Sequence, residues 1–150
     1  MMKLSTKGRY GVRAMFDLAL HYQEGLISLK SIAERQDISE HYLEQLIAIL
    51  KKAGLVKSSR GAQGGYTLSK EPSKITIGEI LRVLEGSLSP SECIDDDMKV
   101  NCPRAEMCVT KKVWEKVKDA VANVVDNITL GELVEDYKKM ASKDSYMFYI

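Results

Sequence analysis

The sequence predicts a mainly α-helical fold that carries one small β-hairpin and a long helix in its second half. Apolar residues recur at helical spacing over most of the 150 residues, which is the pattern of amphipathic helices. Two short strand-like runs flank the glycine-rich stretch 61–65, as in a tight hairpin. A chain of this length forms one domain, or one small domain with an extension.

Three helices are expected before the hairpin. The first covers about residues 9–23, where a broad apolar face ends before a glycine. Ser28 can cap a short second helix that runs through Arg35, and Ser39 can cap a third that ends at Gly54. The third helix is expected to bury one stripe, made of Leu43, Leu46, Ile47 and Leu50.

The hairpin leads into a fourth helix. Its strands are expected over residues 55–60 and 66–69, on either side of the glycine-rich turn. Residues 76–79 read as a capping box, in which a threonine and a glutamate satisfy each other's backbone N–H groups. The helix that starts there should reach Glu85.

Two further helices are expected after an irregular segment. Residues 86–107 show no periodicity, and long loops of this kind are uncommon unless they are functional or disordered. A long helix should follow over 109–128, and a second capping box at 129–132 starts a last helix. Its apolar tail, 146–150, can dock or fray. The long helix carries an apolar stripe spaced as in a packed helical seam, made of Val113, Val117, Val121, Val124, Val125 and Ile128.

These expectations divide the chain into four parts. They are a head (residues 2–86), a cysteine segment (87–108), a long helix (109–128), and a C-terminal helix with its tail (129–150). The net charge of +1 hides an asymmetry: residues 1–75 hold 12 Lys and Arg against 7 Asp and Glu, whereas residues 76–150 hold 10 against 14. A basic first half favours a polyanionic partner.

No apolar run approaches the length of a membrane span, and the N-terminus lacks the apolar stretch of a secretory signal. We therefore expect a cytoplasmic protein with no membrane partner. There is no Ser/His/Asp arrangement, phosphate-binding loop or paired-carboxylate pocket in the pattern, so we expect neither an enzyme nor a small-molecule substrate.

Two short helices, a tight turn and a hairpin make a winged helix-turn-helix, whose second short helix fits the major groove of DNA. The outward residues of that helix are Glu40, His41, Glu44, Gln45, Ala48 and Lys51. Gln45 can pair with adenine, Glu44 can accept from the cytosine amino group, and Lys51 can meet phosphate. At the hairpin tip, Arg60 and Gln63 lie among glycines that let the backbone approach DNA closely. Protein–protein modules and enzyme subdomains also use such helices and hairpins.

The three cysteines of the chain, Cys93, Cys102 and Cys108, fall within sixteen residues. An odd number of thiols is not the pattern of a disulfide scaffold. Clustered thiols in a reducing compartment more often hold metal or respond to oxidants. An iron–sulfur cluster, zinc, and three unligated thiols in a flexible loop are all compatible with this spacing.

Several linked motifs give the chain a family resemblance. It resembles the IscR-like (Rrf-two type) winged helix-turn-helix family of iron–sulfur and redox-responsive transcription regulators over most of residues 2–135. The motifs that carry the resemblance lie at residues 4–15, 38–46, 54–56, 60–66 and 127–133. The resemblance implies a homodimer that binds a palindromic promoter in double-stranded DNA, with the valine-rich helix as the dimerisation helix. The residues we expect to contact DNA are Arg9, Ser39, Glu40, His41, Tyr42, Glu44, Gln45, Lys51, Arg60 and Gln63.

The resemblance also implies a cluster on the three cysteines, with a 2Fe–2S cluster as the first choice and a 4Fe–4S cluster as the alternative. The chain departs from the family pattern twice. The first cysteine gap, eight residues, is longer, and Lys111 stands where the family has a ligating histidine. Protonated lysine is a poor ligand. The fourth ligand is left open among Glu106, Asp95, Asp96, Asp97, the other subunit and a small molecule.

The function we expect is therefore that of a homodimeric repressor whose DNA affinity or sequence preference responds to the cluster. Two alternatives share the fold. One senses nitric oxide or thiol redox state through the same cysteines. The other regulates cysteine metabolism together with a partner enzyme, although relatives in that role need no cysteine segment.

Overall fold

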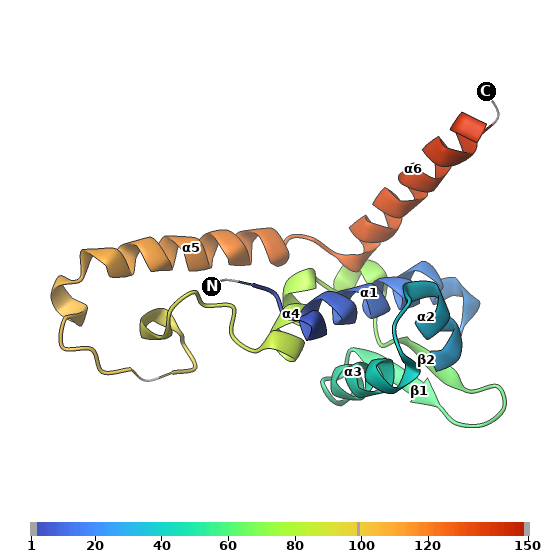
Figure 1. Ribbon diagram of the computed structural model, residues 1–150, viewed down its shortest axis with the longest axis horizontal. Coiled ribbons are helices and arrows are strands. Elements are labelled where there is room, and N and C mark those ends of the chain that lie inside the picture. Colours follow the sequence, from blue (N-terminus) through green and yellow to red (C-terminus); the bar gives the residue numbers. More distant parts are fainter. Residues whose placement is uncertain (1–2, 99, 149–150) are drawn as a thin grey trace.

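The computed structural model describes residues 3–98 and 100–148. Figure 1 shows a head from which α5 extends to one side and α6 to another. The elements are α1 (Thr6–Leu20), α2 (Leu29–Gln36), α3 (Glu40–Lys52), β1 (Val56–Ser59), β2 (Gly65–Leu68), α4 (Ile77–Glu85), α5 (Val109–Val125) and α6 (Leu130–Phe148). Short 3-10 turns cover Tyr22–Glu24, Pro72–Lys74, Glu92–Ile94 and Ala105–Met107. The expected fold class, mainly helical with one hairpin, is confirmed. In the described part of the chain, no helix is apolar over a length that would cross a membrane.

Helix α1 begins earlier than its apolar pattern indicates. It starts at Thr6 rather than near residue 9, because the Ser5 hydroxyl accepts from the N–H of Gly8 at 3.3 Å and caps it. It also ends earlier, at Leu20. The glycines of its first turns, Gly8 and Gly11, have low helix propensity, which hides the start in the sequence. They are tolerated because α4 packs directly against them.

Serine caps begin α2 and α3 where the sequence predicts them. The Ser28 hydroxyl accepts from Ser31 N–H, and the Ser39 hydroxyl accepts from Tyr42 N–H, each at 3.2 Å. Each bond satisfies one of the N–H groups that a helix start leaves free. Asp37, with a positive φ of 53°, closes α2 and makes the turn into α3.

One hydrophobic core joins the first four helices, the hairpin and the start of α6. The predicted stripe of α3 is fully buried, and each such leucine or isoleucine contributes about 1.5–3 kcal/mol by leaving water. The largest apolar side chains with almost no exposed surface are Met15, Leu18, Ile32, Leu43, Leu46, Ile47, Leu50, Ile75, Ile80 and Leu130.

The hairpin is shorter than predicted and gains a third partner. Its antiparallel register runs from Val56 opposite Leu68 to Ser59 opposite Gly65. Ile27, in the connection between α1 and α2, exchanges two backbone hydrogen bonds with Tyr66, both at 2.8 Å. This bridge ties the wing to the helical part of the head.

The two predicted capping boxes differ. At the start of α6 both bonds form: Glu132 N–H donates to the Thr129 hydroxyl, and Thr129 N–H donates to the Glu132 carboxylate, at 3.2 and 3.1 Å. At the start of α4 only one is seen, from Glu79 N–H to the Thr76 hydroxyl. The Glu79 carboxylate lies 3.6 Å from the Lys70 ammonium instead, because the wing strand ends beside it.

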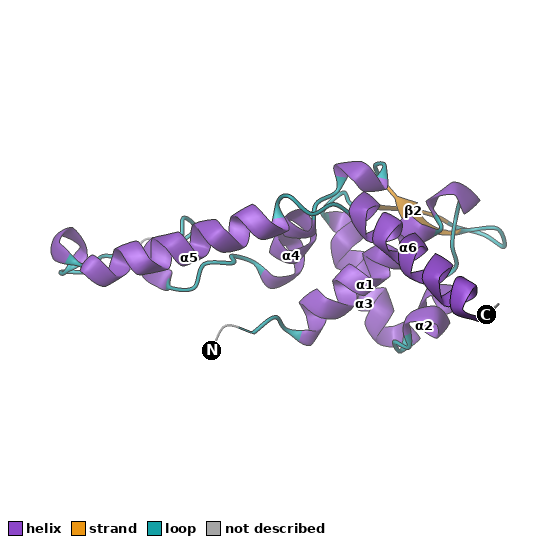
Figure 2. Ribbon diagram, turned by 90° about the horizontal axis from the view of Figure 1, so that it is seen from above, coloured by secondary structure: helices purple, strands orange, loops and turns teal. Residues whose placement is uncertain are grey.

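Helix α5 extends away from the head, as Figure 2 shows from above. None of its residues, all of which the structure describes, is buried. Val113 and Val124, from the predicted stripe, are 50% and 57% exposed. Helix α6 starts in the core with Leu130 and Val134. Further along, the partly exposed ring of Tyr137 meets Phe16 at 5.5 Å, and the far end of the helix projects away from the head. The predicted tail is helical as far as Phe148, and the remainder lies outside the described residues.

Candidate nucleic-acid interface and cysteine segment

Helix α3 presents a polar face to solvent. Its core-facing stripe is buried, so the remaining side of the helix faces away from the core. The predicted contact residues that are exposed on this helix and its cap are Ser39, Glu40, His41, Glu44, Gln45 and Lys51. Gln45 Nε2 lies 3.2 Å from His41 Nε2, so these two polar groups already share a hydrogen bond. The face offers donors and acceptors suited to base edges.

The wing lies on the same side of the head as α3 in Figure 1. Arg60 and Gln63, at its tip, are exposed. Gly61 has a φ of 107°, and Gly64 N–H donates to Gly61 carbonyl at 3.0 Å, which makes the tip narrow. A Cβ on Gly64 would lie 2.3 Å from the Ser59 carbonyl oxygen. The tip can therefore bring a cation close to a phosphate backbone or into a groove.

Tyr42 differs from its neighbours on α3 because it is half-buried. Its ring meets that of Tyr10, on α1, edge to face at 6.0 Å. The guanidinium of Arg13 lies 5.1 Å from the centre of the Tyr10 ring and donates to Gln36 carbonyl at the end of α2. Sequence reasoning did not single out Tyr10 or Arg13. They fix the first turn of α3 against α1, while Arg9 remains exposed.

A buried carboxylate holds α2 against α1. Of the charged residues described, Asp17 is the one that is buried. It accepts two hydrogen bonds from Arg35, at 2.9 and 2.8 Å, and one from the Gln36 side chain at 3.1 Å. These bonds satisfy the carboxylate, as a buried charge requires. They also hold the end of α2, from which the chain turns into α3, against α1.

The three cysteines lie on the cysteine segment, as free thiols. Cys93 is exposed, and Cys102 and Cys108 are half-buried. The Thr110 hydroxyl lies 3.1 Å from Cys108 Sγ, and this hydrogen bond, with the backbone and charge of Lys111, lowers the pKa of the Cys108 thiol. A thiol with a lowered pKa is more readily the thiolate that binds metal.

Within the described ranges, no three Cys, His, Asp or Glu side chains are gathered closely enough to hold a metal ion. The first part of the cysteine segment is held by α5, where Lys118 donates to Ile94 carbonyl at 3.0 Å and to the Asp96 carboxylate at 2.7 Å. The Asp96 bond raises the pKa of Lys118. Cys93 opens onto a pocket of about 420 Å³ in this region, shared with Lys111.

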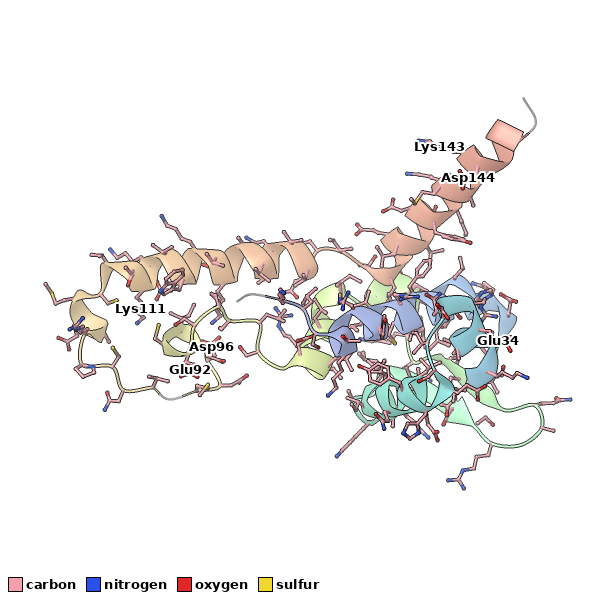
Figure 3. The ribbon with its side chains drawn as sticks, viewed as in Figure 1. Glu34, Glu92, Asp96, Lys111, Lys143 and Asp144 are labelled. Carbon is pink, nitrogen blue, oxygen red and sulfur yellow. The ribbon has the colours of Figure 1, made fainter. Side chains whose placement is uncertain are left out.

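Lys111 and the candidate fourth ligands make different contacts. Lys111 lies 4.0 Å from Glu115 in an i,i+4 pair, and Asp96 is bonded to Lys118. Asp95 accepts from the N–H of Asp97 at 3.0 Å. Glu106 is exposed. Figure 3 shows Glu92 and Asp96 on the cysteine segment and Lys111 at the start of α5.

The family follows from comparison with known proteins. A family model described as Rrf2, iron-dependent transcriptional regulator, matches residues 4–136. The chain belongs to the Rrf2 family of transcription regulators. The head with its wing, described above, has the winged-helix form seen in the solved structures of this family.

Two similar proteins, a CymR and an IscR, match nearly the whole chain. The transcriptional regulator CymR of Bacillus subtilis (strain 168) is 48% identical over 149 residues, which is 99% of this chain and 100% of that protein. Its solved structure, described as the global cysteine regulator, is 49% identical, with a TM-score of 0.75 over 90% of this chain and 98% of that one. The structure of T. potens IscR is 56% identical, also with a TM-score of 0.75, over 92% and 90%. The CymR and IscR relatives matched by sequence are named as transcriptional regulators of the helix-turn-helix type, and no enzyme family is indicated.

Proposed function

We propose that this Rrf2 regulator is a homodimeric, cytoplasmic repressor of palindromic promoters whose DNA affinity or sequence preference is modulated by an iron–sulfur cluster on Cys93, Cys102 and Cys108. The observation that carries the proposal is the separation of two surfaces in one chain. A polar recognition face and wing lie on one side of the head, and α5, an amphipathic helix without buried residues, runs from the cysteine segment back to the head.

The recognition face supports contact with bases, and the wing supports contact with the backbone or minor groove. His41, Glu44 and Gln45 are exposed on one face of α3, at positions where side chains reach base edges in a major groove. Glu44 favours cytosine because its carboxylate accepts from the amino group, and it repels phosphate when misplaced. Arg60 is free to enter a narrow minor groove.

The long helix supports the dimer. A 17-residue helix with an apolar stripe and no buried residue leaves surface that a second copy of the same helix would remove from water. Pairing of α5 with its partner would set two heads on one dimer. Two identical heads related by a twofold axis read a palindrome.

The donor set supports the cluster. Three free thiols in one segment, one of them with a lowered pKa, are the soft ligands that iron–sulfur clusters require. Cys93, Cys102 and Cys108 would hold the cluster, which would supply an iron- or redox-dependent signal. The segment has to gather these thiols around it, because they are apart in the described arrangement. Either Lys111 leaves its pair with Glu115, or another group completes the ligand set.

The first experiment purifies the protein without oxygen and measures its visible spectrum, iron and acid-labile sulfide. Duplexes selected from random DNA by the wild type then report affinity with and without the cluster. We expect coloured protein, loss of colour in Cys102→Ser, and an affinity change of about 5- to 150-fold. Ser89→Ala, a hydroxyl on the same segment, is the matched control. Colourless protein without sulfide after reconstitution overturns the cluster, and failure to select any sequence overturns the regulator.

A second function is favoured by the full-length match to CymR. In this alternative the protein regulates cysteine metabolism together with a partner enzyme. The experiment mixes the protein with purified cysteine-synthesising enzyme from the same organism and follows complex formation by light scattering. A complex whose formation changes DNA binding, in a protein that stays colourless after reconstitution, would favour this reading over the cluster.

A further inference from the structure

Helix α4 lies between α5 and the start of α1, and its side chains form hydrogen bonds with both. One turn before its C-terminus, Arg82 donates two hydrogen bonds to the carboxylate of Asp126, at 2.5 and 2.9 Å. Asp126 caps the end of α5. The pair is bidentate, the geometry in which arginine fixes a carboxylate in orientation as well as distance.

Backbone bonds at the N-terminus of α4 reinforce this contact with the end of α5. The N–H of Ile77 donates to Ile128 carbonyl, and the N–H of Leu130 donates to Ile75 carbonyl, both at 2.9 Å. A Cβ on Gly78 would lie 1.8 Å from Asp126 Oδ1, so only glycine leaves room for the carboxylate. The turn from α5 to α6 therefore packs against the first turn of α4.

The other end of α4 caps α1. The Glu85 carboxylate oxygen Oε1 accepts from Ser5 N–H at 2.9 Å, from the Ser5 hydroxyl at 2.5 Å, and from Gly8 N–H at 3.1 Å. A Cβ on Gly8 would lie 2.2 Å from this oxygen. A carboxylate at a helix N-terminus gains from both the free N–H groups and the helix dipole.

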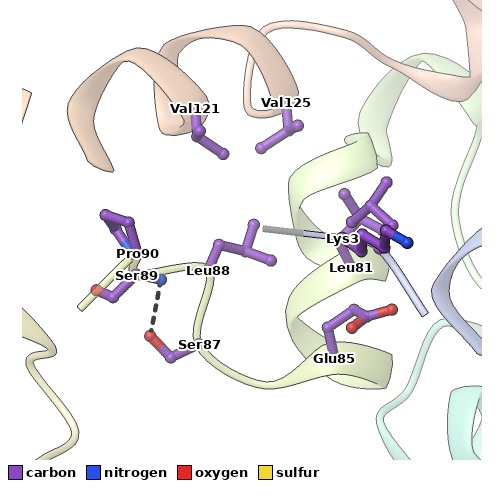
Figure 4. Close-up of a pocket in the computed structure, with 10 residues that line it drawn as sticks. Lys3, Leu81, Glu85, Ser87, Leu88, Ser89, Pro90, Val121 and Val125 are labelled. Carbon is purple, nitrogen blue, oxygen red and sulfur yellow. Dashed lines mark hydrogen bonds between the residues drawn. The ribbon is translucent and has the colours of Figure 1, made fainter. Parts of the chain in front are cut away.

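The chain of contacts continues to the recognition helix. Tyr10, half a turn beyond Gly8, meets Tyr42 in the first turn of α3. The pocket in Figure 4, about 440 Å³, lies where α4 and α5 meet, between Glu85, Leu88 and the Val121 and Val125 side chains of α5. The contact between α4 and α5 therefore has open space in which α5 can shift relative to α4.

We propose that Arg82 and Glu85 are positioning residues through which α4 transmits the placement of α5 to the recognition helix, by way of the first two turns of α1. The inference rests on the proposed function in one respect, namely that the placement of α5 differs between the signal states of the dimer. The test measures the effect at α3 directly.

Hydrogen–deuterium exchange on the full-length protein without DNA supplies that measurement. Glu85→Ala and Asp126→Asn should each speed amide exchange in residues 40–46 while leaving α2 unchanged. Glu79→Gln is the matched control, because it removes a carboxylate of the same helix that bonds to neither α1 nor α5. Glu85→Gln, which keeps an acceptor oxygen, should fall between Glu85→Ala and the wild type.

DNA affinity gives the second measurement, with a duplex selected by the wild type. Glu85→Ala should weaken binding by about 2- to 30-fold although the residue is remote from the wing and from the exposed face of α3. Combined with Tyr10→Leu, the two losses should be less than additive, because both variants break one path.

Exchange in residues 40–46 that matches the Glu79→Gln control, or fully additive losses with Tyr10→Leu, would overturn the link. Uniformly faster exchange over α2 and α3 alike would also overturn it, because it would show loss of stability rather than transmission. If the wild type selects no DNA sequence, the proposed function fails, while the exchange experiment still decides the link.

Discussion

Arg60 stands at the tip of the wing with nothing of the described head covering it. Its positive charge is placed for a groove or a phosphate, and its loss should not disturb the core. Arg60→Ala is expected to weaken binding to a selected duplex by about 1–3 kcal/mol, measured by fluorescence anisotropy, with an unchanged melting temperature. Lys143→Ala removes an equal charge from the far end of α6 (Figure 3) and should have little effect. Equal losses in both variants would refute a role specific to the wing.

Asp17, unlike the exposed Arg60, is a charged residue buried inside the fold. Its carboxylate is 1% exposed and accepts three hydrogen bonds. Asp17→Asn mismatches the bond to Arg35 and should cost about 2–3 kcal/mol of the free energy of unfolding, because bonds to charged groups are strong. Urea denaturation measures the loss. Asp144→Asn, on exposed α6, is the control, and a similar loss there would contradict the explanation.

At the scale of elements, α5 decides the oligomeric state we propose. A charge at an exposed position of its apolar stripe should prevent a second copy from packing there. Val113→Asp is expected to yield monomer by light scattering, whereas Lys112→Asp, on the opposite side of the helix, should remain dimeric. A dimeric Val113→Asp protein would place the interface elsewhere.

The bond between α4 and the end of α5 has a pH dependence of definite sign. Arg82, by its hydrogen bonds, lowers the pKa of Asp126 in the folded protein. The pair therefore stabilises the fold above the ordinary aspartate pKa of about 3.9, and this contribution is lost as the pH falls through the lowered value. Both side chains are partly exposed, so the contribution is at most about 1 kcal/mol.

The stability difference between wild type and Asp126→Asn measures this pair. It should be present at pH 6 and should shrink towards pH 3, by urea denaturation at each pH. Asp119→Asn, on exposed α5, is the control for removing an acid. A difference that is constant over this range would show that the bond contributes nothing through ionisation.

For the whole molecule, a dimer with two fixed heads predicts dependence on DNA phase. Half-sites one turn apart, about 10–10.5 base pairs, present the same face of the duplex to both heads. Inserting about five base pairs between them turns one half-site to the far side. The affinity should then fall to that of a single half-site in a gel-shift assay, and unchanged affinity would indicate heads that bind independently.

Much of the fold could be predicted because its signals are local. Ser28, Ser39, Thr76 and Thr129 act as caps as expected, since a capping hydroxyl needs only the N–H two or three residues ahead. The start of α1 was not predicted, because Gly8 and Gly11 weaken the helical pattern beside the Ser5 cap and because Glu85, which also caps the helix, lies eighty residues away from Ser5. The exposed face of α3 followed from periodicity, whereas the packing of Tyr42 on Tyr10 needed the fold.

The sequence by itself determined the helices, the wing, the exposed polar face of α3 and the presence of three thiols in one segment, because composition and periodicity encode each of them. Only the tertiary structure decided that Ile27 joins the wing and that α4 is bonded to both α1 and α5. It also decided that Lys118 holds the cysteine segment against α5. These contacts join residues far apart in the chain, and no local pattern specifies which distant group will meet a free N–H or a carboxylate.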